Sequence, residues 1–232
     1  MVVLRINYTK HLPQAAKSVR YHAFRTREEP EHKLGAFNRW SNHADVRSFI
    51  DSLDDPLTQD RKLRNGTVLQ PAKMHRLMFS MRRKDWEACG FTSWKPVIRE
   101  ALESFEKQHG IKLEWIAAEH MSSTHPHVHV DVKSVYTAQD GTRHRLRISQ
   151  QMRADLRQSV LRIVEREREL RDEERRQNRE FHSTLRDLTT TLLRGLRDAA
   201  RADDREADGL PGNTPKRRPR KDREDDDRDR GR

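Results

Sequence analysis

Cysteine is almost absent from this chain of 232 residues, which contains Cys89 and no other. A disulfide within the chain is therefore excluded, and so is a zinc site made of several thiolates. A single cysteine also fits a reducing compartment, where thiols do not pair. We expect Cys89 to be a buried apolar residue and the chain to be cytoplasmic.

Long hydrophobic runs are also missing, and the mean hydropathy is −1.09. A helix that crosses a membrane needs about 20 successive apolar residues, so no membrane insertion is expected. Residues 1–8 alternate like a strand and lack the charged and then apolar segments of a signal peptide. A glycine-rich Lys-Ser/Thr phosphate loop is missing too, so unwinding of DNA would have to come from a partner.

Acidic residues are too few to balance the basic ones. The chain has 48 Lys and Arg against 37 Asp and Glu, a net charge of +11 and a pI of about 10.1. This charge favours a polyanionic partner. Nucleic acid is favoured over an anionic lipid surface because the sequence has no basic amphipathic anchor.

The hydrophobic pattern predicts an α+β fold in which helices back an antiparallel sheet. Apolar residues alternate in strands and recur every three or four positions in helices. The predicted strands are 2–8, 74–81, 113–120, 127–135 and 143–149, and the predicted helices are 13–27, 43–53 and 96–109. A long helical region and a charged tail rich in Gly and Pro follow. We therefore expect a core at 1–149, a helical extension at 150–206 and a disordered basic tail at 207–232.

Three histidines fall on two neighbouring predicted strands. His127 and His129 are two positions apart, so both side chains leave the same face of their strand, while alternating valines occupy the other face. A short loop joins this strand to the preceding one and brings His120 back beside them. Three imidazoles can then converge on one divalent ion and leave positions open for a phosphate oxygen or water. The pattern favours a catalytic metal site over exposed strand histidines.

The segment WIAAEHMSSTHPHVHVDVKS, residues 115–134, resembles the three-histidine site of relaxases in the HUH endonuclease superfamily. The resemblance is to the mobilization group whose nucleophilic tyrosine lies near the N-terminus. It implies that His120, His127 and His129 bind the metal, with Mn²⁺ or Mg²⁺ preferred and Zn²⁺, Co²⁺ or Ni²⁺ as alternatives. His125 is then expected to orient the site or contact phosphate, and Asp131 to orient a ligand imidazole.

Two further motifs support the resemblance, which covers about residues 1–165. AAKSVRYHAFR, residues 15–25, is similar to the nucleophile helix and implies that Tyr21 is the attacking residue. HRLMFSM, residues 75–81, is similar to the strand from which Ser80 contacts DNA. The chain departs from the family at Ser18, where the family often has His, and in the loop 122–124, where it often has Asp.

The resemblance implies a conjugative or mobilization relaxase, an endonuclease that nicks single-stranded DNA at an origin of transfer of a plasmid. Tyr21 would attack the phosphate and form a covalent 5′-phosphotyrosine link between protein and DNA. Relaxosome accessory proteins and coupling proteins are the implied protein partners. The residues expected to bind DNA or support the site are Ser80, His75, His125, Asp131, Arg25, Arg145 and Arg147.

Three alternatives stay open at the level of sequence. A rolling-circle replication initiator or single-strand transposase shares the histidine pair, although the N-terminal position of Tyr21 is unusual for either. A DNA-binding accessory protein that does not cut DNA would explain the basic charge without needing Tyr21. His22 is a second candidate nucleophile beside Tyr21.

Overall fold

The computed structural model describes residues 2–24, 35–121 and 124–208, with side chains as far as residue 199. It divides into two compact units, Met1–Arg175 and Arg176–Arg232. Arg25, two residues of the 122–124 loop and nearly all of the expected basic tail lie outside the described residues.

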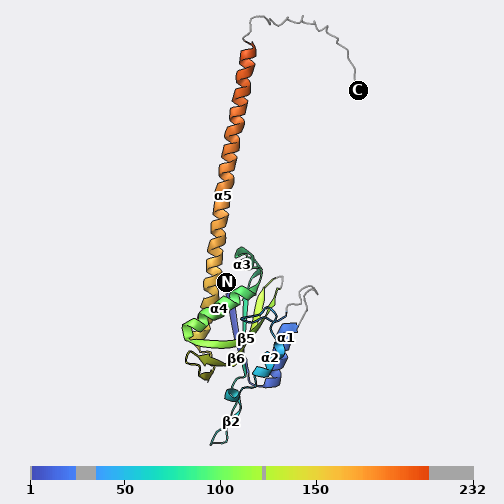
Figure 1. Cartoon of the computed structure of the whole chain (residues 1–232), viewed down its shortest axis with the longest axis vertical. Coiled ribbons are helices and arrows are strands. Elements are labelled where there is room, and N and C mark those ends of the chain that lie inside the picture. Colours follow the sequence, from blue (N-terminus) through green and yellow to red (C-terminus); the bar gives the residue numbers. More distant parts are fainter. Residues whose placement is uncertain (1, 25–34, 122–123, 209–232) are drawn as a thin grey trace, which may run out of the picture. The chain divides into compact units, whose positions relative to one another are not determined.

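The first unit has the predicted α+β architecture (Figure 1). All of the predicted strands and helices are present, and a short helix after residue 82 and a small hairpin are added to them. In chain order the elements are β1 (Val2–Thr9), α1 (Leu12–Phe24), α2 (Val46–Ser52), η1 (Pro56–Thr58), β2 (Arg61–Lys62), β3 (Val68–Leu69), β4 (Met74–Met81), α3 (Arg83–Ala88), α4 (Trp94–His109), β5 (Ile111–His120), β6 (His127–Ala138), β7 (Arg143–Arg145) and α5 (Gln150–Asp208).

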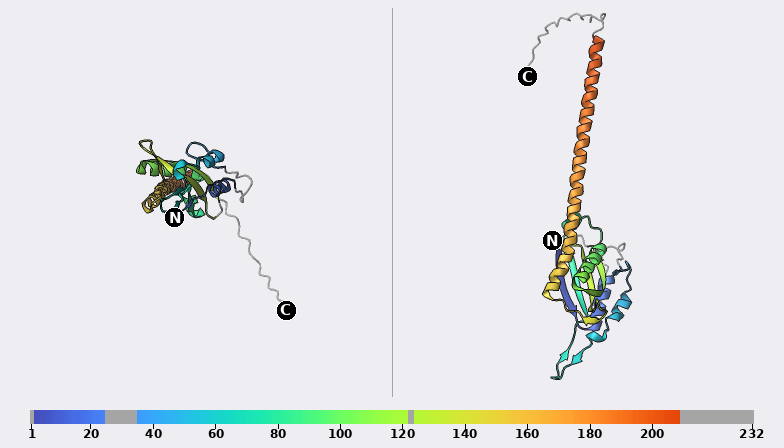
Figure 2. Two further views of the ribbon diagram at one scale, coloured as in Figure 1. Left: turned by 90° about the horizontal axis from the view of Figure 1, so that it is seen from below. Right: turned by 60° about the vertical axis from the view of Figure 1, so that its left-hand side comes forward.

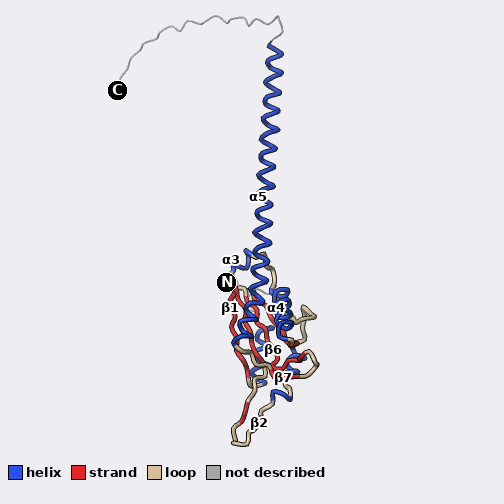
Figure 3. The backbone as a smooth tube through the Cα atoms, turned by 90° about the vertical axis from the view of Figure 1, so that its left-hand side faces the viewer, coloured by secondary structure: helices blue, strands red, loops and turns tan. Residues whose placement is uncertain are grey.

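The main sheet is antiparallel, in the order β1-β4-β6-β5, with β7 paired to the far end of β6. The strand that carries two of the predicted metal ligands is therefore central and has a neighbour on each side. Strands β2 and β3 form a separate ribbon that leaves this sheet, as Figure 3 shows. Gly66 turns that ribbon at φ +82°, a conformation in which a side chain would be strained.

One face of the sheet carries the larger hydrophobic core. Alternate residues of β6, including Val128, Val130 and Val132, are fully buried there with Leu77 and Phe79 of β4. Helix α4 and the start of α5 cover this face and contribute the residues Val97, Ile98, Ala101, Leu102, Phe105, Leu156, Val160 and Ile163. Two views in Figure 2 show these helices against the sheet. The valine face is therefore the core face, as the alternation predicts.

The opposite face of the sheet carries the histidines and is covered by α1 and α2. A second, smaller core lies beneath these helices, where Ala15 and Val19 of α1 meet Ile50 of α2 and Ile116 of β5. Small alanine side chains let α1 lie close to the strands. The polar face is thus mostly enclosed, and burial reaches Asp131 at 2% exposure.

Side chains satisfy free backbone groups at the start of helix α4, and a glycine ends the helix. Ser93 accepts a hydrogen bond from the Lys95 amide at 3.1 Å, and Glu119 accepts one from the Trp94 amide at 2.8 Å. Gly110 ends the helix in the left-handed region at φ +63°. Residues at the end of β5 therefore have structural as well as chemical roles.

Helix α5 is buried at its start and exposed further along. Its first turns pack into the core of the first unit, which extends to Arg175. In the second unit the described leucines between residues 185 and 196 are exposed. None of the described helices is long and apolar enough to span a membrane.

A matched pair of phenylalanine substitutions tests this division of the chain. Phe105 is 1% exposed and Phe181 is 60% exposed. We expect Phe105→Ala to lower the free energy of unfolding by about 3–5 kcal/mol, because it removes a ring from a packed core, and Phe181→Ala to change it by about 0.5 kcal/mol or less. Urea unfolding followed by tryptophan fluorescence measures both. Equal effects would contradict the burial described here.

Candidate functional site

Two adjacent strands bring the predicted metal ligands to one end of the sheet. His120 of β5 lies directly opposite His127 of β6, and His127 is also opposite Ser80 of β4. His129 follows on the same face of β6, between Ala118 and Met78. Cross-strand neighbours on one face have Cβ atoms about 4.5–5.5 Å apart. The hairpin predicted from the spacing of the histidines is therefore present.

The three imidazole rings form a compact triangle. The ring centroids of His120 and His127 are 5.2 Å apart, those of His120 and His129 are 5.4 Å apart, and those of His127 and His129 are 5.3 Å apart. The ring of His129 stands nearly perpendicular to the other two, at 83° and 86°. The rings thus share one small volume at the edge of the covered face.

Helix α1 is held against this triangle by His22. Its Nδ1 lies 2.8 Å from Oδ2 of Asp131, and its ring stacks on His129 at a centroid distance of 4.0 Å and an interplanar angle of 6°. The main chain of the same residue also takes part, because its carbonyl oxygen lies 3.1 Å from Nε2 of His120. One residue therefore connects the N-terminal helix to both histidine strands.

Backbone carbonyl acceptors determine which ring nitrogen of His120 and of His127 carries the hydrogen and which keeps its lone pair. A carbonyl oxygen can only accept, so Nε2 of His120 donates to His22 and its Nδ1 is the basic nitrogen. Nδ1 of His127 donates to the His125 carbonyl at 3.0 Å, so its Nε2 is the basic nitrogen. Metal-binding histidines are commonly oriented by such a second hydrogen bond.

Burial keeps His129 neutral. Desolvation lowers the pKa of His129 to about 2, and the neighbouring His22, His127 and His120 and the more distant Arg76 add to the effect. The ring therefore carries no proton charge near neutral pH. A neutral imidazole is the form that binds a metal.

The donor chemistry of this triangle suits a borderline divalent metal. Three imidazoles around one ion with nitrogen-to-metal distances of about 2.0–2.1 Å would have centroids about 4.5–5.2 Å apart, and the observed separations of 5.2–5.4 Å lie just beyond that range. The nitrogen atoms themselves are not gathered around one point, since the described residues contain no group of three His, Cys, Asp or Glu side chains arranged to hold an ion.

Tyr21 lies next to His22 on α1 and is about half exposed. It precedes His22 on α1, its ring centroid is 6.1 Å from that of His22, and 47% of the residue is exposed. The other two tyrosines are placed differently. Tyr8 is on β1, opposite His75, and Tyr136 is near the far end of β6, opposite His144. Of the three, Tyr21 is next to a residue that contacts the triangle.

Asp131, the predicted orienting carboxylate on β6, and Glu119 on the neighbouring β5 have different partners. Glu119 lies away from the triangle and accepts hydrogen bonds from Ser93 and Trp94 at the start of α4. Asp131 faces the site, as the strand alternation predicts, but its partner is His22 and none of the three predicted ligands. Oδ1 of Asp131 is buried without a hydrogen-bond partner in the part of the chain that is described.

The remaining predicted site residues are spread over the molecule. Ser80 and His125 lie at the histidine end of the sheet. His75 faces the opposite side, where burial lowers its pKa and its Nε2 lies 3.1 Å from the Leu146 carbonyl, so it has a structural role there. Arg145 pairs with the far end of β6, about 20 Å along the strand from His129, and Arg147 follows it. Thus the structure does not bring these two arginines together with the triangle.

Ser18, where the sequence departs from the family pattern, lies on the same side as the triangle. It is buried, and its hydroxyl accepts a hydrogen bond from Nη1 of Arg76 at 3.3 Å. Arg76 in turn is opposite Asp131 in the register of β4 and β6. The serine therefore contacts a partly buried cation beneath α1 and is not a ligand in this arrangement.

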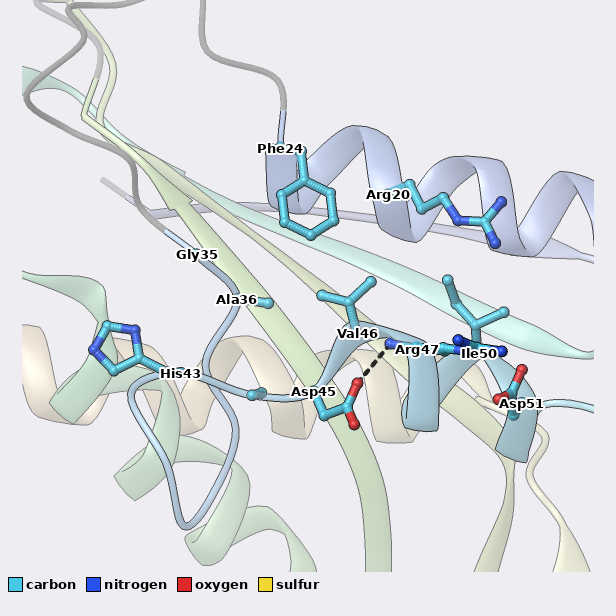
Figure 4. A pocket seen from close by; sticks show the side chains of 11 residues that line it. Arg20, Phe24, Gly35, Ala36, His43, Asp45, Val46, Arg47, Ile50 and Asp51 are labelled. Atoms are coloured by element: carbon cyan, nitrogen blue, oxygen red, sulfur yellow. Dashed lines mark hydrogen bonds between the residues drawn. The ribbon is translucent and has the colours of Figure 1, made fainter.

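Two features of the site were not predicted from the sequence. The first is the connecting role of His22, which was considered only as a second nucleophile. The second is a pocket of about 770 Å³ between α1 and α2. Figure 4 shows Arg20 and Phe24 of α1 on one side of it and Val46 and Ile50 of α2 on the other.

Comparison with known proteins gives matches among solved structures alone, since no family model and no curated protein matches the sequence. One match is TrwC complexed with a 27-mer DNA comprising the recognition hairpin and the cleavage site. The alignment covers 72% of this chain and 69% of the TrwC chain, at 13% identity and a TM-score of 0.40. The metal-bound conjugative relaxase TrwC in complex with oriT DNA aligns with 72% and 70%, at 12% identity and a TM-score of 0.42. A copper-bound complex aligns to the same extents, at 10% identity and a TM-score of 0.43. Solved relaxase structures are thus among those that align with this chain, and its function has to be inferred from its own residues.

Proposed function

We propose that this chain is a metal-dependent relaxase that nicks single-stranded DNA at an origin of transfer and remains attached to the 5′ end through Tyr21. The observation that carries the proposal is the attachment of α1 to the histidine strands. The stack of His22 on His129 at 4.0 Å ties to the histidine triangle the helix that carries the exposed Tyr21 one residue earlier. A nucleophile next to a metal-binding cluster is the arrangement that phosphoryl transfer requires.

The three histidines of the triangle would hold the divalent ion. Such an ion supplies positive charge that neutralises the phosphate as negative charge grows in the transition state. The protein contributes by keeping His129 neutral and by fixing the tautomers of His120 and His127 through carbonyl acceptors. Mn²⁺ and Mg²⁺ are the first ions to test, followed by Zn²⁺, Co²⁺ and Ni²⁺.

Tyr21 would carry out the covalent step. Its hydroxyl oxygen attacks the phosphorus, one phosphorus–oxygen bond forms to the tyrosine, and the bond to the 3′ oxygen breaks. The phenolic proton ends on the 3′ oxygen, so the products are a 5′-phosphotyrosine and a 3′-hydroxyl. Because one phosphodiester is exchanged for another, the reverse reaction can rejoin a strand.

His22 is better suited to position the helix than to attack DNA. Its side chain is only 11% exposed, and Nδ1 is engaged by Asp131. An in-line attack needs an accessible atom with room for the phosphate. Tyr21 satisfies that requirement and His22 does not.

The histidine end of the sheet also carries basic residues that could hold the DNA backbone. The backbone amide of Met81 donates to the Pro126 carbonyl and that of Arg83 to the Thr124 carbonyl, which ties the end of β4 to the loop before β6. Arg82, Arg83 and Lys84 therefore lie beside the triangle. Contacts of this kind give affinity and salt dependence without sequence preference. A role in plasmid mobilization with accessory and coupling proteins belongs to this same proposal.

Replacement of the β6 histidines tests the metal site. We expect His127→Ala and His129→Ala each to abolish metal-dependent nicking of single-stranded origin DNA while the unfolding midpoint changes little, because the opposite valine face carries most of the packing. His144→Ala, an exposed histidine on β7, is the control and should retain full activity. Nicking is measured on a labelled oligonucleotide with Mn²⁺ or Mg²⁺. Undiminished nicking by the His127/His129 double variant would rule out the site.

Replacement of Tyr21 tests the nucleophile separately. Tyr21→Phe removes only the attacking oxygen, so it should bind DNA and metal as the unmodified chain does and form no covalent adduct. Tyr8→Phe, another exposed tyrosine, should form the adduct normally. Denaturing gels measure the adduct, and peptide mapping locates it. DNA found on Tyr8 or His22, or an adduct that persists in Tyr21→Phe, would show that another residue attacks.

A further inference from the structure

Trp40 differs from the other tryptophans of the chain by being almost completely exposed. It is 87% exposed, whereas Trp86, Trp94 and Trp115 are exposed by 1%, 0% and 5%. Leaving an indole in water forfeits the free energy that its burial would contribute to folding. The fold therefore gains little from Trp40 where it stands.

The turn that presents Trp40 is firmly held. The side chain of Asn38 accepts hydrogen bonds from the amides of Trp40 and Ser41 at 2.9 and 2.8 Å. Arg99 of α4 then donates to the Asn38 carbonyl at 2.9 Å and to the Ser41 carbonyl at 3.0 Å. Its guanidinium also donates to the side chain of Asn42 at 2.8 Å. The exposed indole thus projects from a preorganised turn.

The surroundings of Trp40 are polar and partly cationic. The guanidinium of Arg39 lies 5.6 Å from the indole ring centroid and also pairs with Glu106. The remaining neighbours in the turn are Asn38, Ser41, Asn42 and His43. Protein-binding hot spots are usually surrounded by other contacts that exclude water. A lone aromatic ring among polar and basic groups is typical of sites that stack bases of single-stranded nucleic acid.

The turn lies on the same edge of the sheet as the histidine hairpin. Phe37 forms a β-bridge with Ala117 of β5, with hydrogen bonds of 2.8 Å in both directions. Ala117 is three residues before His120, about 10 Å along the strand, and Trp40 is three residues beyond Phe37. The greatest possible separation of Trp40 from His120 is therefore about 25 Å, or roughly seven stacked nucleotides at ~3.4 Å each.

We propose that Trp40 is a stacking platform for a base of single-stranded DNA that lies a few nucleotides from the phosphate at the histidine site. The assignment rests on the proposed function for the identity of the strand. The held turn fixes the backbone that carries the ring before binding, so no ordering of the turn opposes the stacking of a base. Stacking of this type tolerates any base, so Trp40 adds affinity and not sequence preference.

The three buried tryptophans make fluorescence a direct test. The Tyr21→Phe chain, which cannot form the adduct, is titrated with a single-stranded 12-mer of deoxythymidine without metal at low salt. Stacking should quench the emission of the exposed indole, and Trp40→Phe in the same background should lose that quenching while it retains most of the affinity. Trp40→Ala should weaken binding by ~5- to 150-fold. Phe181→Ala, an exposed aromatic of the second unit, should bind as strongly as its parent.

Three results would overturn the platform. They are equal affinity of Trp40→Ala and its parent, equal quenching in Trp40→Phe, and failure of the parent to bind the oligonucleotide. Unchanged DNA binding by Trp40→Ala would instead favour a protein as the partner of this turn. The proposed function can fail on its own. If the Tyr21→Phe chain shows Trp40-dependent quenching but the chain with Tyr21 intact forms no covalent adduct with DNA, the stacking platform is retained and the nickase is excluded.

Discussion

The contact of His22 with Asp131 and His129 is the interaction on which the rest of the site depends. It combines a 2.8 Å hydrogen bond to a buried carboxylate with a ring stack at 4.0 Å, and both cross from α1 to the central strand. The alanines of α1 allow the close approach that this contact needs. The contact adds, at the residue after Tyr21, a hydrogen bond and a ring stack to the apolar packing that already holds α1 on the sheet. His22 thus contributes both to the packing of α1 and to the histidine site.

Enclosure of a polar sheet face explains the unusual protonation of the site. Helices α1 and α2 remove water from Asp131 and His129, and burial is the largest cause of the low pKa of His129. A buried carboxylate is costly unless it is paired, and here His22 is its partner while Arg76 lies opposite in the register. The same low-dielectric setting strengthens the interaction of any bound cation with a phosphate. Packing of the helices therefore keeps His129 in the neutral form that the proposed metal site needs.

Alternation and spacing predicted the strands, the valine core face and the convergence of His120, His127 and His129, because a side-chain period of two is a local property. They could not predict what covers the other face. Whether α1 lies on the polar side is decided by long-range packing of alanines and by one histidine–aspartate pair, and neither leaves a periodic signal. The distance of Arg145 from the triangle is likewise set by the pairing of β7 with the far end of β6, which the local pattern does not contain.

Counting the imidazole nitrogens around a bound ion tests the central claim most directly. The chain is loaded with one equivalent of Cu²⁺, which imidazole also binds, and pulsed electron paramagnetic resonance records the couplings to the remote ring nitrogens. The account predicts one ion per chain coupled to three imidazoles, and loss of two of these couplings in the His127→Ala/His129→Ala double variant. A spectrum that the double variant leaves unchanged would contradict it, because the ion would then be bound elsewhere.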